Sequence, residues 1–137
     1  ERLFNYAKEK DISLIISTHE IQEVMPWLDQ IIVLQEGRLI QNESPRDIYS
    51  NPYNAYVAKL FGEVNIFSDE EKAYFGLSKN FWYPNEIKIA SSGKEARILE
   101  SRFAGNHYWN KVLVSGKELT IYSETQLSGE SAVHFAD

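Results

Sequence analysis

The sequence predicts two pieces of different architecture, an α/β segment followed by a small, partly closed β-barrel. The first prediction rests on an alternation of helix, buried strand and helix near the N-terminus, which is typical of α/β sheets. The second rests on short β-rich stretches with turn signals between them, which fill about the last 55 residues. The sequence pattern changes near Val64, where an irregular aromatic stretch and then short β-rich stretches replace the helical periodicity. We therefore expect residues 1–63 and 64–137 to form separate pieces.

Composition narrows the class of protein. The chain has 137 residues, of which 43% are hydrophobic and 25% are charged, as in soluble globular proteins. It has no cysteine, which excludes disulfides and thiolate chemistry. The net charge is −6 and no basic cluster occurs, so we expect no binding to nucleic acid, whose phosphates need neutralising cations. No apolar run approaches the roughly 20 residues of a membrane-spanning helix.

The first predicted element is a short amphipathic helix, because Leu3, Phe4 and Ala7 have helical spacing. The chain begins with Glu1, and the periodicity is present from there onward. We therefore expect this chain to be a fragment of a longer protein.

A buried strand and a second helix are predicted next. Residues 12–17, ISLIIS, form a continuous apolar run, as expected of a parallel strand buried on both faces. Apolar residues then recur at helical spacing, and Ser17 and Glu20 stand three apart, as a capping box would place them. Pro26 should kink or end this helix, because proline removes a backbone donor.

A hairpin and two short helices complete the first piece. Residues 31–41 are predicted as two strands around a tight Glu-Gly turn. Ser44 is expected to be an N-cap, with Pro45 at the first helical position. The stretch NAYVAKLFG is predicted as a further helix that ends at Gly62.

The second piece begins with an irregular, aromatic stretch, DEEKAYFGLSKNFWYP, which we expect to be a connector. Its acidic residues 69–71, followed at once by Lys72, are expected to be a solvated helix start. Five short strands follow, in EIKIA, KEARILESRF, NHYWNKVLV, KELTIY and SAVHF. Gly116 and Lys117 lie between two of these apolar stretches and predict a hairpin. Five short strands favour a small barrel of the oligonucleotide/oligosaccharide-binding (OB) kind.

The candidate site lies where the predicted parallel strand ends. Ser17, Thr18, His19 and Glu20 follow the apolar run directly, and ligands of open α/β sheets bind beyond the carboxyl ends of the strands. A histidine in this place can donate a hydrogen bond to a phosphate oxygen. The alternative interpretation is that His19 caps the following helix.

Residues 14–67 resemble the C-terminal stretch of ATP-binding cassette (ABC) transporter ATPases. In that family a strand ends in Thr-His-Asp/Glu, and three further motifs follow it. This chain supplies THE, DQIIVLQEG, SPRDIYSNP and YVAKLFGEVN, in that order and with small gaps. The last motif is typical of the importer branch. The resemblance implies that residues 1–63 are the remnant of an ABC nucleotide-binding domain, with an α/β fold.

The resemblance also implies a function for the intact protein. His19 would be the switch histidine that contacts the γ-phosphate of ATP, so it is both the expected catalytic and the expected cofactor-binding residue. The intact protein would bind ATP and Mg²⁺, pair with a second copy, and use hydrolysis to drive membrane permease subunits from the cytoplasmic face of the membrane. Sugars, polyamines, ferric ion, sulfate and phosphonates are all open as the transported solute.

Residues 64–137 are similar to the TOBE domain, the accessory C-terminal domain of importer ATPases, which serves regulation or dimer contacts. YPNEIKI stands where that family has R-P-E-x-I-x-I, and the later strands match its valine and glycine pattern. Tyr83 replaces the usual arginine, and Asn85 interrupts the Pro-Glu pair.

The motifs that hold ATP in this family are absent from the sequence. A phosphate loop needs G-x-x-x-x-G-K-[ST], but both Gly-Lys pairs, at residues 93–94 and 116–117, are followed by glutamate. No apolar run ends in the acidic pair that holds Mg²⁺. LSGES, at residues 127–131, resembles the family signature LSGGQ, but it follows His19 instead of preceding it. We therefore expect the chain alone to be inactive and to hold no cofactor and no metal.

A second hypothesis is a stand-alone regulatory module that binds a small oxyanion or a partner protein. Such a site needs converging donors, and the second piece offers five basic side chains: Lys94, Arg97, Arg102, Lys111 and Lys117. Its aromatic residues could stack a ligand but are expected in the core: Trp82, Tyr83, Tyr108 and Trp109. His107 and His134 have no partner at metal-ligand spacing and are expected to be structural.

Overall fold

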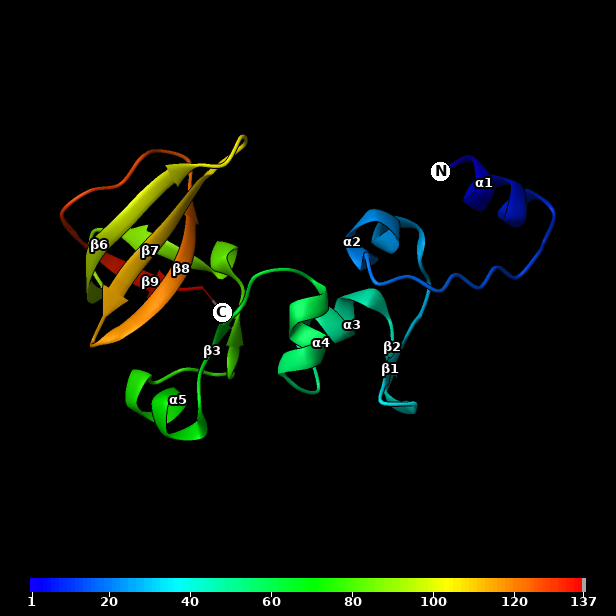
Figure 1. Ribbon diagram of the computed structural model, residues 1–137, viewed down its shortest axis with the longest axis horizontal. Coiled ribbons are helices and arrows are strands. Elements are labelled where there is room, and N and C mark those ends of the chain that lie inside the picture. The colour runs from blue at the N-terminus through cyan, green and yellow to red at the C-terminus, as the bar shows by residue number, and fades with distance from the viewer. Residues whose placement is uncertain (137) are drawn as a thin grey trace. The chain divides into compact units, whose positions relative to one another are not determined.

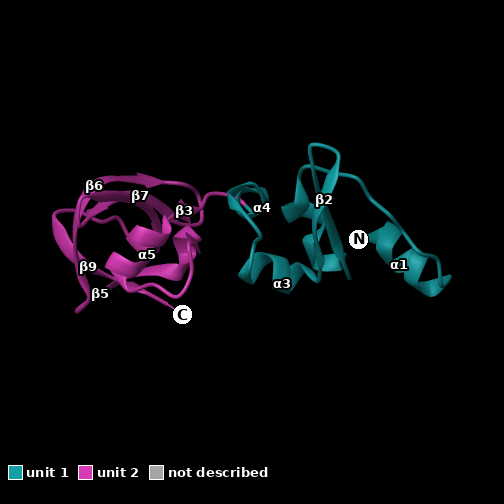
Figure 2. Cartoon of the chain, turned by 90° about the horizontal axis from the view of Figure 1, so that it is seen from below, with its two compact units in different colours: residues 1–61 teal, residues 62–137 magenta. Residues whose placement is uncertain are grey.

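A computed structural model describes residues 1–136 and divides the chain into two compact units, residues 1–61 and 62–137 (Figures 1 and 2). Asp137, the last residue of the predicted second piece, lies outside the described residues. No helix among residues 1–136 has the length and the apolar character that crossing a membrane requires.

Unit 1 begins with helical segments. Helix α1 spans Arg2–Glu9, as the spacing predicts, and the ring of Phe4 stacks on that of Trp27 at 5.6 Å. Helix α2 is a single turn, Ile21–Val24, and a 3₁₀ turn, η1, follows at Met25–Trp27. Proline tolerates the first positions of a helical turn but not the interior, so Pro26 ends α2 as predicted. No side chain caps α2, so the predicted capping box of Ser17 is wrong.

The predicted buried strand at residues 12–17 is not formed. The segment is irregular and exposed, and the side chain of Ile15 is 95% accessible to solvent. A parallel strand buried on both faces needs a hydrogen-bonded neighbour and helices that cover the sheet. Among the described residues no strand pairs with this segment. An apolar run alone therefore does not make a strand here, and the predicted α/β sheet is absent from unit 1.

The remainder of unit 1 has the elements that the sequence predicts, a hairpin and two short helices. Strands β1 (Ile31–Gln35) and β2 (Arg38–Glu43) form an antiparallel hairpin, and both turn residues between them have positive φ. Helix α3 (Pro45–Ser50) is capped by Ser44, whose hydroxyl accepts a hydrogen bond from the backbone of Asp47. Helix α4 (Ala55–Leu60) is capped in the same way by Asn54. Ile48, Val57 and Ala58 are fully buried and form the core of this unit.

Unit 2 opens with a short strand and a helix. Strand β3 (Asn65–Ile66) pairs with β4 (Phe81–Trp82), and helix α5 (Asp69–Phe75) lies between them in sequence. Ser68 and Glu71 form a complete capping box at the start of α5. The predicted helix start at residues 69–71 is thus confirmed, and the stretch expected to be an irregular connector contains an ordered helix. Lys117 donates to Glu71 at 2.8 Å, and this bond, with the backbone N–H of Ser68, lowers the pKa of the Glu71 carboxyl.

Five strands form one antiparallel sheet, in the order β5-β9-β6-β7-β8. They are β5 (Ile87–Ala90), β6 (Lys94–Phe103), β7 (Tyr108–Val114), β8 (Lys117–Ser123) and β9 (Glu130–Phe135), and a 3₁₀ turn, η2 (Pro84–Glu86), precedes them. The five predicted strands are thus confirmed, including the hairpin between β7 and β8. The sheet curls strongly, so that unit 2 is compatible with an OB-like barrel (Figure 1).

The core of unit 2 is apolar and aromatic. The inward positions of β7 and β8, such as Val112 and Ile121, are completely buried. Trp82 is also completely buried. Its ring packs edge-on against that of Phe135, with 5.1 Å between the ring centroids. Each such side chain contributes about 1.5–3 kcal/mol on burial. The prediction that the four aromatic residues lie in the core is confirmed for Trp82 and Tyr83 but wrong for Tyr108 and Trp109, which are only partly buried.

The edge of this sheet is covered by one side-chain amide. Asn65 is 7% exposed; its Nδ2 donates to the carbonyl of Thr120 at 2.8 Å and to that of Trp82 at 3.2 Å. Its Oδ1 accepts from the backbone N–H of Thr120 at 2.7 Å. An edge strand presents unpaired N–H and C=O groups, and this amide satisfies one of each on β8. We call this set of three hydrogen bonds the Asn65 clamp.

Replacing Asn65 by alanine should destabilise unit 2 by about 2–4 kcal/mol, because it leaves backbone groups of Thr120 and Trp82 without partners. Urea unfolding followed by tryptophan fluorescence measures this loss. Asn106→Ala, at an exposed site in the turn after β6, is the matched control and should change the unfolding free energy by less than about 0.5 kcal/mol. A loss below about 1 kcal/mol for Asn65→Ala would mean that the clamp is not needed.

Candidate functional site

His19 lies in the irregular segment before α2. Its side chain is 93% exposed, and its Nε2 is 3.7 Å from a carboxylate oxygen of Glu20. The hydroxyl of Thr18 accepts a hydrogen bond from the backbone of Glu20, which is the N-cap residue of α2. His19 therefore does not cap the helix, and its ring is open to a ligand.

The strand end at which His19 was predicted to lie is not formed. The expected site needs the carboxyl end of a parallel strand, and residues 12–17 form none. Ser17, Thr18 and His19 are all exposed. Across residues 1–136, no three histidine or acidic side chains are grouped in a way that could hold a metal ion.

The hollow of unit 1 is polar and open, with a volume of about 540 Å³. Gln41 crosses it and donates to the carbonyl of Asn51 at 2.9 Å, while its Oε1 accepts from the backbone of Tyr53 at 2.9 Å. The lining residues include the carboxylates of Glu43 and Asp47 but no lysine or arginine. Phosphate oxygens would meet negative charge here, so the hollow does not fit the triphosphate of ATP.

Three of the five basic side chains considered for an oxyanion site in unit 2 are paired with carboxylates. Lys117 binds Glu71 at 2.8 Å, Lys111 lies 3.6 Å from Glu118, and Arg102 pairs with Glu100. Lys94 lies over the ring of Phe75, 5.5 Å from its centroid. Cations already paired with carboxylates offer little charge to an oxyanion, so this arrangement speaks against an oxyanion site in the barrel.

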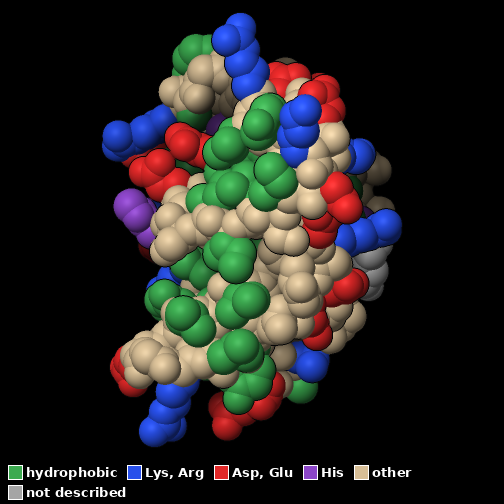
Figure 3. Space-filling view, turned by 90° about the vertical axis from the view of Figure 1, so that its right-hand side faces the viewer, with side chains coloured by type: hydrophobic (Ala, Val, Ile, Leu, Met, Phe, Trp, Pro, Cys, Tyr) green, Lys and Arg blue, Asp and Glu red, His purple; other side chains and the backbone are tan. Residues whose placement is uncertain are grey.

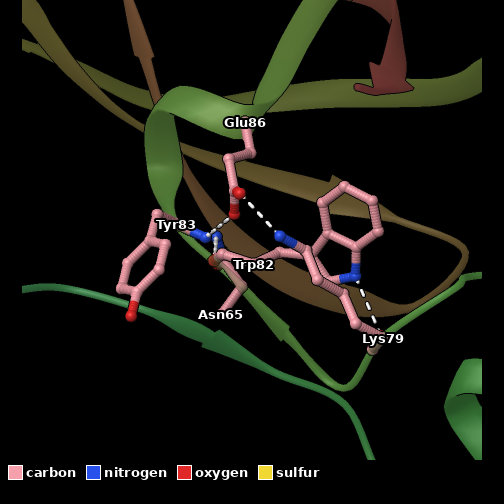
Figure 4. Close-up of polar contacts among 5 residues, drawn as sticks. All are labelled: Asn65, Lys79, Trp82, Tyr83 and Glu86. Atoms are coloured by element: carbon pink, nitrogen blue, oxygen red, sulfur yellow. Dashed lines mark hydrogen bonds and ion pairs between the residues drawn. The ribbon is translucent and has the colours of Figure 1, made fainter. Parts of the chain in front are cut away.

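Lys79 and Glu86 form a compact polar contact beside Trp82 (Figure 4). Lys79 Nζ donates to Glu86 Oε1 at 2.6 Å and lies 4.7 Å from the centroid of the Trp82 ring. The other oxygen of Glu86 accepts from the backbone of Tyr83 at 2.7 Å. The ring of Tyr83, which stands where the resemblance has arginine, points away from this pair in Figure 4. Lys79 thus supplies the positive partner of Glu86.

Glu63 anchors the start of unit 2 to the outer face of its sheet. Its carboxylate accepts hydrogen bonds from Trp109 at 2.9 Å, from Thr120 at 3.4 Å and from Tyr122 at 3.5 Å. Burial, and then the charge of Glu63 and its hydrogen bond, raise the pKa of Tyr122. Sequence reasoning missed this contact, because Glu63 and Trp109 are 46 residues apart.

Two further histidines lie on the surface of unit 2. The His107 ring lies 4.1 Å from that of Tyr122, and its Nδ1 is 2.6 Å from the amide oxygen of Asn106. His134 is exposed on β9. His107 is therefore held by contacts with neighbouring side chains, and His134 is part of a strand.

Figure 3 shows hydrophobic side chains that gather in a band on one face of the molecule. Within unit 1, exposed apolar side chains occur on the segment of residues 12–16 and on the hairpin, where Ile32, Leu34 and Leu39 are more than half exposed. Exposed apolar side chains that gather in one region usually mark an interaction surface.

No protein-family model matches the chain. Its sequence is, however, similar to that of three curated ATP-binding proteins. It is 33% identical over 102 residues to the spermidine/putrescine import ATP-binding protein PotA of Vibrio cholerae, which covers 67% of this chain and 26% of the relative. It is 47% identical over 57 residues to the protein of the same name from Pasteurella multocida, covering 42% and 15% of the two chains. The corresponding protein of Mannheimia succiniciproducens is 48% identical over 56 residues, covering 41% and 15%.

The chain thus spans about a quarter or less of the length of the relatives it matches. The matches are partial, as they would be for a C-terminal fragment of such a subunit. The predicted resemblance is confirmed: in sequence, this chain is a relative of the ATP-binding subunits of ABC importers.

Proposed function

We propose that this chain is the C-terminal part of the ATP-binding and ATP-hydrolysing subunit of an ABC importer. The observation that carries the proposal is the 102-residue match to an importer ATP-binding protein. The order of the four motifs in residues 14–67 supports it, because each stands where the family has it. Any one of these motifs alone would be weak.

The two predicted pieces are assigned within this proposal. Residues 1–63 are the end of the nucleotide-binding domain, and residues 64–137 are a TOBE-like accessory domain with a regulatory role. The exposed apolar run of residues 12–16 supports the first assignment, since a strand of an α/β domain would be apolar on both faces. The curled five-stranded sheet supports the second.

ATP and Mg²⁺ belong to the intact protein in this proposal. The sequence has no phosphate loop, and the hollow beside Gln41 is lined by carboxylates, so neither offers a site for the triphosphate. We propose His19 as the one residue here that contacts the γ-phosphate. Its exposed ring and its position directly after the apolar run support this role.

The proposed partners follow from the same assignment. The intact subunit would pair with a second copy and act on membrane permease subunits, at the cytoplasmic face of the membrane. The relatives are named for import of spermidine and putrescine, so the proposed solute is a polyamine. The ATP-binding subunit would energise uptake, and the permeases would select the solute.

Replacing His19 by alanine in the intact subunit, assembled with its permeases, should lower magnesium-dependent ATP hydrolysis by about 100-fold or more. One donor to a developing negative charge is typically worth about that factor. The measurement is the steady-state release of phosphate. His107→Ala, which removes a histidine of unit 2, is the matched control and should leave the rate within about twofold. A His19→Ala subunit with the wild-type rate would rule out the proposed role.

The isolated 137-residue chain should neither hydrolyse ATP nor bind it in a calorimetric titration. It should also show no saturable heat with molybdate, sulfate or phosphate, because three of the five candidate basic side chains, Arg102, Lys111 and Lys117, are already paired with carboxylates. Magnesium-dependent turnover by the chain would overturn the assignment to a partial subunit. Saturable oxyanion binding would instead favour the second hypothesis, a stand-alone binding module.

A further inference from the structure

Asn110 carries a buried amide in the interior of unit 2. It lies on β7, opposite Ile121 of β8 and Ser101 of β6, and none of its surface is exposed. Its Nδ2 is within hydrogen-bond distance of three oxygens: the carbonyl of Tyr108 at 3.1 Å, the carbonyl of Ile121 at 3.2 Å and the hydroxyl of Ser123 at 2.9 Å. The donor side of this amide is therefore fully used.

The acceptor side of the same amide has no partner. Asn110 Oδ1 is buried, and among the described residues no donor reaches it. Exchanging the oxygen and nitrogen of the amide would not help, since the oxygen would then face the carbonyl oxygens of Tyr108 and Ile121. A buried acceptor without a donor is costly, and in folded proteins such groups are usually satisfied by an internal water.

Ser101 supplies the second group that such a water needs. Its Oγ accepts a hydrogen bond from the backbone of Leu127 at 3.1 Å, and its own hydroxyl hydrogen has no acceptor within the described chain. Ser101 and Asn110 are directly opposite in the β6–β7 ladder. The Cα atoms of opposite residues in antiparallel strands are about 4.5–5.5 Å apart, and their side chains leave the same face of the sheet. A single water can therefore bridge the two side chains. Ser123 is not available, because its hydroxyl already donates to the carbonyl of Thr125 at 2.7 Å.

We propose that unit 2 holds one internal water, which donates to Asn110 Oδ1 and accepts from the hydroxyl of Ser101. This water completes a polar network at one end of the barrel interior. The network also holds the loop after β8, through the bonds of Thr125 to Ser123 and of Leu127 to Ser101. The LSGES stretch at residues 127–131 therefore begins at a barrel contact and enters strand β9.

Oxygen-17 relaxation dispersion of the 137-residue chain tests this site, because it detects long-lived internal water and is insensitive to hydroxyl exchange. Asn110→Leu should remove one long-lived water relative to the wild-type chain. Asn106→Ala, an exposed asparagine in the turn after β6, should leave the amount of bound water unchanged. An equal amount of long-lived water in Asn110→Leu and in the wild-type chain would overturn the proposal.

A second measurement on the wild-type chain does not depend on whether a variant folds. The side-chain amide protons of Asn110 should show a cross-relaxation peak with water of the sign expected for a bound molecule. The amide protons of Asn65 are the internal control: this amide is buried, but both its donor and its acceptor atoms have protein partners. A water peak at neither amide, or an equal one at both, would contradict the assignment. Ser101→Ala should abolish the peak at Asn110.

Discussion

The Asn65 clamp is the interaction on which the closure of unit 2 depends. A sheet of five strands that curls on itself leaves an edge, and β8 would otherwise present unpaired backbone groups to solvent. One amide group donates and accepts there and also holds the short β3–β4 pair. Asn65 is the last residue of YVAKLFGEVN, the last of the four motifs that carry the resemblance, so this motif ends on the residue that clamps the edge of the second unit.

Unit 1 contrasts with unit 2 in how its apolar residues are covered. Unit 2 buries its aromatic core, and the amide nitrogens of its buried residues Asn65 and Asn110 donate to backbone carbonyls of the same unit. Unit 1 has a small core under α3 and α4, but it leaves the run at residues 12–16 and one side of the hairpin exposed. This difference is what the proposed function requires, because an accessory barrel can close by itself whereas the end of an α/β domain cannot.

The elements that sequence reasoning predicted well are those specified locally. The hairpin turn of unit 1, the Ser44 cap and the five strands all depend on residues that are neighbours in the chain. The strand at residues 12–17 failed because it depends on partners that the described residues do not contain. Of helix α5 only the start at Asp69 was predicted, since the aromatic residues that follow suggested a connector. Long-range contacts of single residues, such as Glu63 with Trp109, leave no local pattern in the sequence. His19 was singled out by the family resemblance and not by residue spacing.

The most direct test of this account is backbone hydrogen exchange of the 137-residue chain, resolved by residue. The account predicts that amides of residues 13–17 exchange nearly as fast as in an unfolded chain, because no strand pairs with them. It predicts that amides of β7, and the Thr120 amide held by Asn65, exchange only through global unfolding of unit 2. Protection of residues 13–17 equal to that of β7, or rapid exchange at Thr120, would contradict it.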